Sequence, residues 1–365
     1  MDTIKRTLKV LEWDTILEHL AKHATSDKGK ERCLNAPLYN NLDIIRKELN
    51  YTTEARTLLD LMHSPPLGGI RDIEESVQAS KHTPSLNNVE LLDIAKTIQT
   101  SRLLKSFLAD HQEKTPSLFA LSGDLFADKE LEDAILDVFD DYGNVLDSAS
   151  PQLKSLRNAH RDQVNNLKDK LSRLITSSSI SKYLQESVYT IRDDRYVVPV
   201  KVEHKAHVPG IVHDVSASGS TLFIEPKAIV ELNNRVKELE LQIDAEIKRI
   251  LSELTQKISE KADEILPALE VLTELDFIFA KAKYSIQLKA SEPELNNNKY
   301  LSMQGMRHPI LLTVIDNVIP NDFELGKGAN VMIITGSNTG GKTVTLKSVG
   351  LFVLMTKAGM HVPAI

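Results

Sequence analysis

The sequence predicts a multidomain, mainly α protein. A long antiparallel coiled-coil arm with a small β tip precedes the start of an α/β P-loop domain. Three observations predict this class: apolar residues at three- and four-residue intervals over most of the chain, a β-branched stretch between two long helical segments, and a phosphate-loop motif near residue 340. A chain of 365 residues is also longer than one compact domain usually holds, so two or three units are expected.

The cysteine count, the apolar runs and the net charge of the sequence exclude several classes of protein. Cys33 is the only cysteine, so an internal disulfide is excluded and a reducing, cytoplasmic location is expected. No apolar run approaches the roughly twenty residues that cross a bilayer. The net charge of −7 argues against a broadly basic coat, so any site for nucleic acid has to be regional.

The chain is expected to be helical from its start to about residue 126. Apolar side chains such as Leu8, Leu11, Ile16 and Leu20 recur at helical spacing, and a turn cluster at 63–69 interrupts them. The lone Trp13 and the scattered histidines lack metal-ligand spacing, which favours core or surface roles.

A short hairpin around Gly143 and a long helix from Pro151 to Ser177 come next, the helix capped by Ser150. Residues 151–185 carry seven basic and two acidic side chains, a local excess of +5 in an acidic chain. A solvated coiled-coil face and a phosphate-contacting face both fit this pattern.

Two stretches rich in β-branched residues, 188–203 and 210–225, predict a small sheet with basic and hydroxyl side chains. A hydrolase arrangement of Asp194, His213 and Ser216 has no nucleophile elbow to support it. The candidate nucleic-acid contacts on the helix and the sheet are Lys154, Arg157, Arg161, Lys168, Arg192, Arg195, Lys201 and Lys205.

The chain returns as a helix over about 227–265, which would be roughly 55–60 Å long. Pro267 predicts a break before a second apolar helix at 269–288. The polar stretch 291–298 predicts a domain boundary, and short strands are expected after it, at residues 300–303, 310–314 and 318–319.

The most specific motif follows these strands. Gly336, Gly341, Lys342 and Thr343 occupy every fixed position of G-x-x-x-x-G-K-[ST], between an apolar run at 331–334 that predicts a buried parallel strand and a predicted helix. A plain glycine-rich turn is the alternative. In a P-loop, backbone N–H groups bind the phosphates of ATP, Lys342 reaches the β- and γ-phosphates, and the Thr343 hydroxyl ligates Mg²⁺. The predicted ATP phosphate-binding residues are Gly336, Ser337, Asn338, Thr339, Gly340, Gly341, Lys342, Thr343 and Val344.

Residues 307–310, 318–325 and 335–350 together resemble the start of the ATPase domain of the MutS family. Residues 192–203 and 209–226 are similar to the bacterial MutS-two branch, which lacks the mismatch-reading domain. In agreement, the sequence begins directly in helices and has no Phe-x-Glu wedge motif near its start. The resemblance covers essentially the whole chain. It implies a helical core and lever at 1–150 and 262–295, a clamp arm at 151–261 with its β tip at about 187–226, and the first part of an ABC-like ATPase domain at 296–365.

The resemblance also implies ATP and Mg²⁺ as cofactors and a homodimer whose clamps embrace branched DNA, with a role in suppressing homologous recombination. Related members are implicated in splitting stalled, collided ribosomes, which makes the ribosome and its rRNA alternative partners. By position, the adenine contact falls near Val318 and Ile319. The chain ends at Ile365, before the family's Walker B acid, signature motif and C-terminal nuclease-like domain. We therefore expect no ATP turnover by these 365 residues, and the expectation of a dimer is weakened.

Two other classes remain open. The chain would fit a non-catalytic coiled-coil module that binds a ribosome or another partner and retains a P-loop. A chromosome-organising ATPase arm of the SMC kind shares the coiled coil, but its P-loop lies near the N-terminus, whereas Gly336 lies near the end of this chain.

Overall fold

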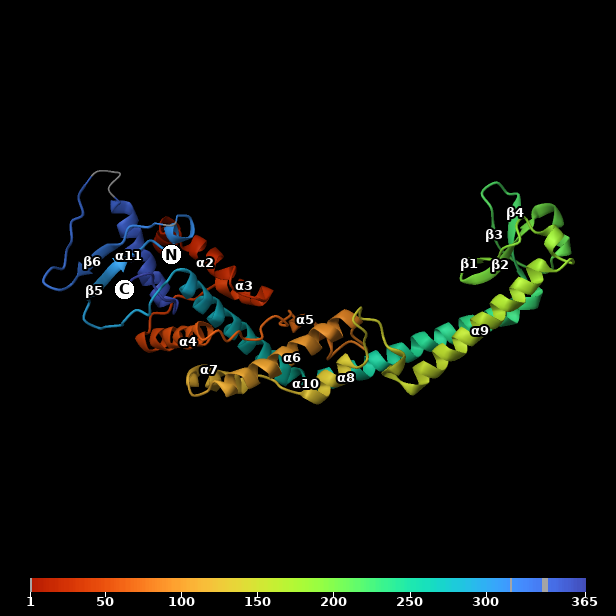
Figure 1. The fold of residues 1–365 in the computed structure, drawn as a ribbon, viewed down its shortest axis with the longest axis horizontal. Helices are drawn as coiled ribbons and strands as arrows, with labels where there is room; N and C mark the ends of the chain where they lie inside the picture. The colour runs from red at the N-terminus through yellow and green to blue at the C-terminus, as the bar shows by residue number, and fades with distance from the viewer. Residues whose placement is uncertain (1, 316, 337–340) are drawn as a thin grey trace. The chain divides into compact units, whose positions relative to one another are not determined.

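A computed structural model describes residues 2–315, 317–336 and 341–365 of the protein. This part of the chain is mainly helical with small antiparallel sheets, which confirms the mainly α part of the predicted class (Figure 1). Two compact units are distinguished: unit 1 contains Met1–Thr83, Val89–Asp133 and Lys257–Ile365, and unit 2 contains Pro84–Asn88 and Ala134–Gln256. None of the helices in the described ranges combines the length and apolar character that a membrane span requires.

The predicted N-terminal helical region is confirmed. Trp13 is 3% exposed and packs in a core with Phe277, Tyr284 and Phe352, so of the two roles predicted for it, core or surface, it has the core role. The helices are α1 (Asp2–Val10), α2 (Trp13–Ala21), α3 (Asp27–Leu34), α4 (Leu42–Asp60), α5 (Glu74–Ala79), α6 (Asn88–Asp110), α7 (Pro116–Leu121) and α8 (Lys129–Leu136).

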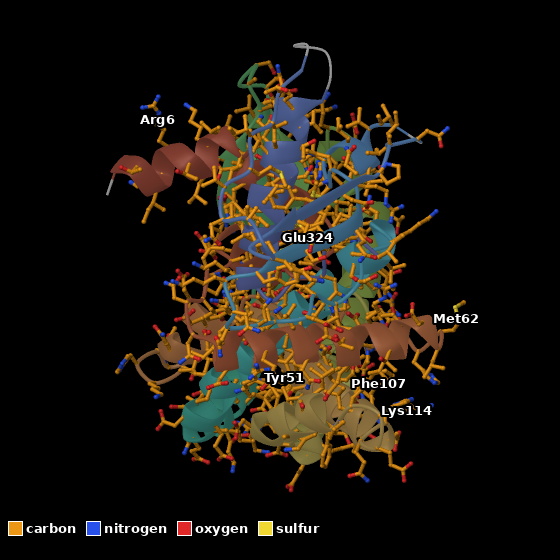
Figure 2. All side chains as sticks on the ribbon, turned by 90° about the vertical axis from the view of Figure 1, so that its left-hand side faces the viewer. Arg6, Tyr51, Met62, Phe107, Lys114 and Glu324 are labelled. Carbon is orange, nitrogen blue, oxygen red and sulfur yellow. The ribbon has the colours of Figure 1, made fainter. Side chains whose placement is uncertain are left out.

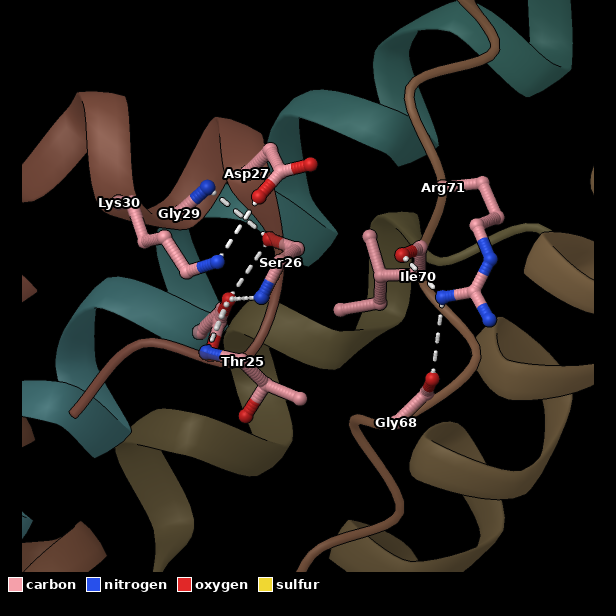
Figure 3. A network of polar contacts seen from close by, with 9 residues as sticks. Thr25, Ser26, Asp27, Gly29, Lys30, Gly68, Ile70 and Arg71 are labelled. Atoms are coloured by element: carbon pink, nitrogen blue, oxygen red, sulfur yellow. Dashed lines mark hydrogen bonds and ion pairs between the residues drawn. The ribbon is translucent and has the colours of Figure 1, made fainter. Parts of the chain in front are cut away.

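A buried carboxylate fixes the start of α3. The Ser26 hydroxyl accepts a hydrogen bond from the Gly29 N–H at 2.9 Å and caps the helix (Figure 3). Asp276 in turn accepts from the backbone N–H groups of Thr25 and Ser26 at 2.8–3.1 Å and from the Ser26 hydroxyl at 2.7 Å. A Cβ at Gly29 would lie 2.1 Å from the Asp276 carboxylate, so this close approach requires glycine.

Asp276 lies on α10 (Val230–Gln287), a single helix of 58 residues that contributes to both units. The predicted break at Pro267 is therefore wrong. A proline inside a helix removes one backbone hydrogen bond and costs about 3 kcal/mol. Pro267 is exposed, so its ring faces solvent, while the neighbouring Ala268, Leu269 and Leu272 are buried. Burial of that apolar face offsets the local cost.

The second unit contains the predicted helix and sheet. α9 (Pro151–Thr176) begins at Ser150, whose hydroxyl accepts from the Leu153 N–H at 2.9 Å and donates to the Glu246 carboxylate on α10 at 2.7 Å. An antiparallel bridge between Phe139 and Val145 confirms the expected hairpin. The sheet has the antiparallel order β1-β2-β4-β3, formed by β1 (Thr190–Arg192), β2 (Arg195–Lys201), β3 (Gly210–Val215) and β4 (Thr221–Pro226).

The strands predicted between residues 300 and 319 are correct only in part. β5 (Leu301–Met306) pairs antiparallel with β6 (Asn321–Leu325), which carries Glu324 (Figure 2). The strand expected at 310–314 is wrong, because Leu311–Thr313 is a 3-10 turn, and none forms at 318–319. Pro320 has no N–H to donate to a ladder, and β6 begins directly after it.

The buried parallel strand predicted at 331–334 is also wrong. Val331 and Ile333 are 78% and 83% exposed, and no strand is assigned there. A parallel strand obtains its backbone hydrogen bonds from parallel neighbours. Every sheet in the described ranges is antiparallel, so these residues have no such neighbour. The helix predicted after the loop is confirmed as α11 (Lys342–Lys357).

Candidate functional site

Two glycines of the phosphate-loop motif adopt backbone conformations that other residues rarely reach. Gly336 has φ 149° and Gly341 has φ 78°, the latter directly before the first turn of α11. Ser337, Asn338, Thr339 and Gly340 lie outside the described residues. The described ends of the motif thus have the glycine-dependent geometry that a loop entering a helix needs.

Lys342 joins the two described ends of this loop. Its ammonium group donates a hydrogen bond to the Gly336 carbonyl, six residues earlier in the chain. Thr343 is exposed and Val344 is half-buried in the first turn of α11, where the helix dipole places partial positive charge. An ammonium, an exposed hydroxyl and a helix N-terminus therefore occur together, which is the donor set that a phosphate group requires.

The helix behind the loop packs against the N-terminal helices. A Cβ at Gly350 would lie 2.7 Å from the Leu11 side chain, so α11 approaches that residue closely. Lys347 donates to Glu12 at 2.6 Å, and this bond holds the pKa of the Glu12 carboxyl below its usual value. Leu351 and Phe352 are buried on the same helix.

The segment after α11 is bonded to two long helices. The Gly359 carbonyl accepts from the Thr52 hydroxyl on α4 at 2.6 Å. His361 is 3% exposed and lies between Ser285 on α10, at 2.8 Å, and Thr53 on α4, at 3.0 Å. Val362 and Ser291 exchange two backbone hydrogen bonds. No local sequence pattern predicts these contacts, because the bonded residues are far apart in the chain: Ser285 and His361 are 76 residues apart, and Thr53 and His361 are 308 apart.

Val318 is half-buried and Ile319 is 80% exposed. Their role as the adenine contact stays a prediction.

Two of the candidate nucleic-acid contacts hold the hairpin against α9. Arg157 donates to the Asp147 carboxylate at 2.6 Å and to the Val145 carbonyl at 2.8 Å. Arg161 lies 4.0 Å from the same carboxylate and is 64% exposed. Arg157 is therefore engaged within the protein, and Arg161 is only weakly paired.

The arginines of the sheet are also engaged. Arg192 pairs with Asp214 at 3.1 Å and lies over the Phe223 ring at 4.5 Å. Arg195 donates to Asn234 at 2.6 Å and lies 3.4 Å from the buried Glu225. Both side chains stabilise the sheet and its contact with α10.

The lysines among the candidates differ from the arginines. Lys154, Lys168 and Lys205 are exposed and Lys201 is half-buried; none has an ion pair or side-chain hydrogen bond with another described residue. An open depression of about 360 Å³ runs along one face of α9, lined by Arg157, His160, Arg161, Val164, Asn165 and Lys168. The unpaired lysines are the cations most available to a polyanion.

Asp194, His213 and Ser216 do not form the hydrogen-bonded triad of a hydrolase. Asp194 pairs with Lys237 at 2.8 Å, His213 contacts Glu225 at 2.6 Å, and the Ser216 hydroxyl lies 3.3 Å from that of Ser218. Each of the three groups thus has another partner.

Comparison with known proteins gives one consistent result. The chain is 45% identical over 363 residues to the endonuclease MutS2 of Geobacillus sp. (strain WCH70) and 41% identical over 362 residues to that of Alkaliphilus oremlandii. It is 42% identical over 363 residues to the endonuclease MutS2 of Bacillus cytotoxicus. Each match covers 99% of this chain and 46% of the relative, so the chain spans about half the length of these curated relatives. No family model matches.

Proposed function

We propose that this chain, a member of the MutS2 branch of the MutS family, is a nucleotide-responsive clamp that binds branched DNA and suppresses homologous recombination. The observation that carries the proposal is the placement of Lys342. It bonds back to the Gly336 carbonyl at the N-terminus of a helix whose far end is tied to α4 and α10. These bonds support a connection between the proposed phosphate-binding loop and α10, the helix that continues into the proposed arm.

In this proposal the motif residues 336–344 hold the phosphates of ATP, and the Thr343 hydroxyl ligates Mg²⁺. The residues present fit these groups, because Gly336 and Gly341 have the required conformations. Among the described residues, the Lys342 ammonium bonds one carbonyl, whose place a phosphate oxygen would take. Lys342 and the first turn of α11 would face the negative charge that ATP carries. A displacement of α11 would reach α4 through the bond between Gly359 and Thr52, and α10 through the bond between His361 and Ser285.

The first test concerns nucleotide binding. Replacing Lys342 by Ala is expected to weaken binding of a fluorescent ATP analogue with Mg²⁺ at least about tenfold, since a charge-assisted bond to phosphate is lost. Lys347→Ala is the matched control, because Lys347 lies on the same helix but pairs with Glu12. Equal affinity of Lys342→Ala and the unchanged protein would contradict the proposed site.

The second test concerns the arm. Replacing Lys154 and Lys168 together by Ala is expected to weaken binding to a four-way DNA junction and to lower the salt dependence, log K against log salt, by about 2. Lys96→Ala with Lys114→Ala is the control pair, since both lysines are exposed in unit 1; Lys114 follows α6 (Figure 2).

An unchanged salt slope would exclude these lysines as phosphate contacts. Tight ribosome association without junction binding would instead favour the ribosome and its rRNA as the target.

A further inference from the structure

Three rings gather where α9 leads into the sheet. The turn η3 (Ser181–Tyr183) follows α9, and the turn η4 (Val202–His207) follows β2. A bridge between Leu184 and Val200 holds the two turns side by side. The Tyr183 and His207 rings stack with centroids 4.4 Å apart and planes 24° apart. The His204 ring lies 5.2 Å from the first and 5.8 Å from the second. We call Tyr183, His204 and His207 the ring platform.

The platform is anchored on one side and open on the other. Tyr183 is half-buried and packs against the apolar core of the sheet, whereas His207 is exposed. Neither the His204 nor the His207 ring has a hydrogen bond or ion pair with any residue that the structure describes. Among the described residues, the exposed imidazole contacts the Tyr183 and His204 rings, and part of its surface is open to solvent.

Lysines lie on the same segments as the platform. The Lys182 ammonium lies 4.9 Å from the centre of the Tyr183 ring, and Lys201 and Lys205 have no partner among the described residues. Two carboxylates belong to the same segments, Glu186 and Glu203, both exposed. Three lysines and two glutamates give these segments a net charge of about +1, and one ring of the platform, His207, is exposed. This combination is typical of proteins that bind single strands, in which bases stack on rings and phosphates meet ammonium groups.

We propose that the ring platform binds an unpaired nucleobase of single-stranded nucleic acid, with the base stacked on His207 and the adjoining phosphates near Lys182 and Lys205. A base inside a duplex is covered on both faces by its neighbours and offers no face to a protein ring. The inference rests on the proposed function and deepens it: at a DNA branch, the arm would contact phosphates through α9 and an unpaired base through the platform.

The test uses the full chain with labelled oligothymidylate, the corresponding oligouridylate and a matched duplex. His207→Ala is expected to weaken binding to oligothymidylate about tenfold and to leave duplex binding unchanged, because stacking on one ring is lost. His207→Trp is expected to restore or exceed the original affinity, since indole keeps a stacking face. Oligouridylate shows whether RNA or DNA is preferred, because the two share the stacking chemistry. His207 is exposed, so the melting temperatures of the variants are expected to match that of the parent.

Unchanged oligothymidylate binding by His207→Ala would overturn the platform. Equal loss with single strand and duplex would do the same, because it indicates a general charge or folding effect. If the junction is bound but the single strand is not, only the platform fails. If neither is bound, the proposed function fails with it.

Discussion

Replacing Lys281 by Met is expected to lower the free energy of unfolding by about 3–5 kcal/mol. The Lys281 side chain is 0% exposed and donates to the Glu48 carboxylate at 2.9 Å, which joins α10 to α4. The ammonium also lies 4.5 Å from the centre of the Phe277 ring. Met keeps most of the volume but leaves Glu48, whose side chain is 10% exposed, without its cation. Urea unfolding followed by circular dichroism measures the change.

The double variant Lys281→Met with Glu48→Met separates the cost of an unpaired charge from the cost of lost packing. Removing both charges is expected to recover most of the stability, because an apolar pair of similar volume replaces the ion pair. If the double variant were as unstable as the sum of the two single variants, the charge pair would not be the cause.

When the pH is lowered from 7 to 4, titration of His361 is expected to decrease the free energy of unfolding by about 3 kcal/mol. Burial, with the nearby cations Arg56 and Lys281, lowers the pKa of His361 from 6.5 to about 4. Above pH 6.5 the ring is neutral in both states and contributes nothing. As the pH falls towards 4, the unfolded chain takes up a proton that the folded protein does not. Stability therefore falls by about 1.36 kcal/mol for each of these 2.5 pH units and levels off below pH 4.

His361→Gln is the matched variant for this prediction. Glutamine is uncharged at every pH and keeps groups able to bond Ser285 and Thr53. Other groups also titrate in this range, so the informative quantity is the difference between the two curves of unfolding free energy against pH. That difference is expected to change by about 3 kcal/mol between pH 7 and 4. Parallel curves would show that His361 does not titrate differently in the two states.

Several parts of the fold were predictable because their signals are local. Ser150 and Pro151 mark the start of α9 by a capping hydroxyl and a first-turn proline, and the structure has both where they were expected. The β-branched stretches after residue 188 form the sheet for the same reason: residue type and turn residues decide short antiparallel pairing. Of the motif glycines, Gly336 and Gly341 have the positive φ angles that their positions in a phosphate loop imply.

The predictions that were wrong concern segments whose structure depends on residues distant in the sequence. Pro267 removes one backbone hydrogen bond of the helix, which predicts a break. Helix α10 nevertheless continues through Pro267, because the apolar face of α10 is packed against other residues. The apolar run before Gly336 predicts a parallel strand, which depends on partners that the run does not itself contain.

Residue order alone was enough to predict the mainly helical class, α9 with the sheet that follows it, and the resemblance to the MutS family. Which cations are available to a ligand depends on the folded chain. Arg157 and Arg192 look as basic as Lys154 and Lys168 in the sequence, but Asp147 and Asp214 engage the two arginines. Pairing of charges depends on which side chains the fold brings within about 4 Å, and at that range an ion pair competes directly with a polyanion for the same cation.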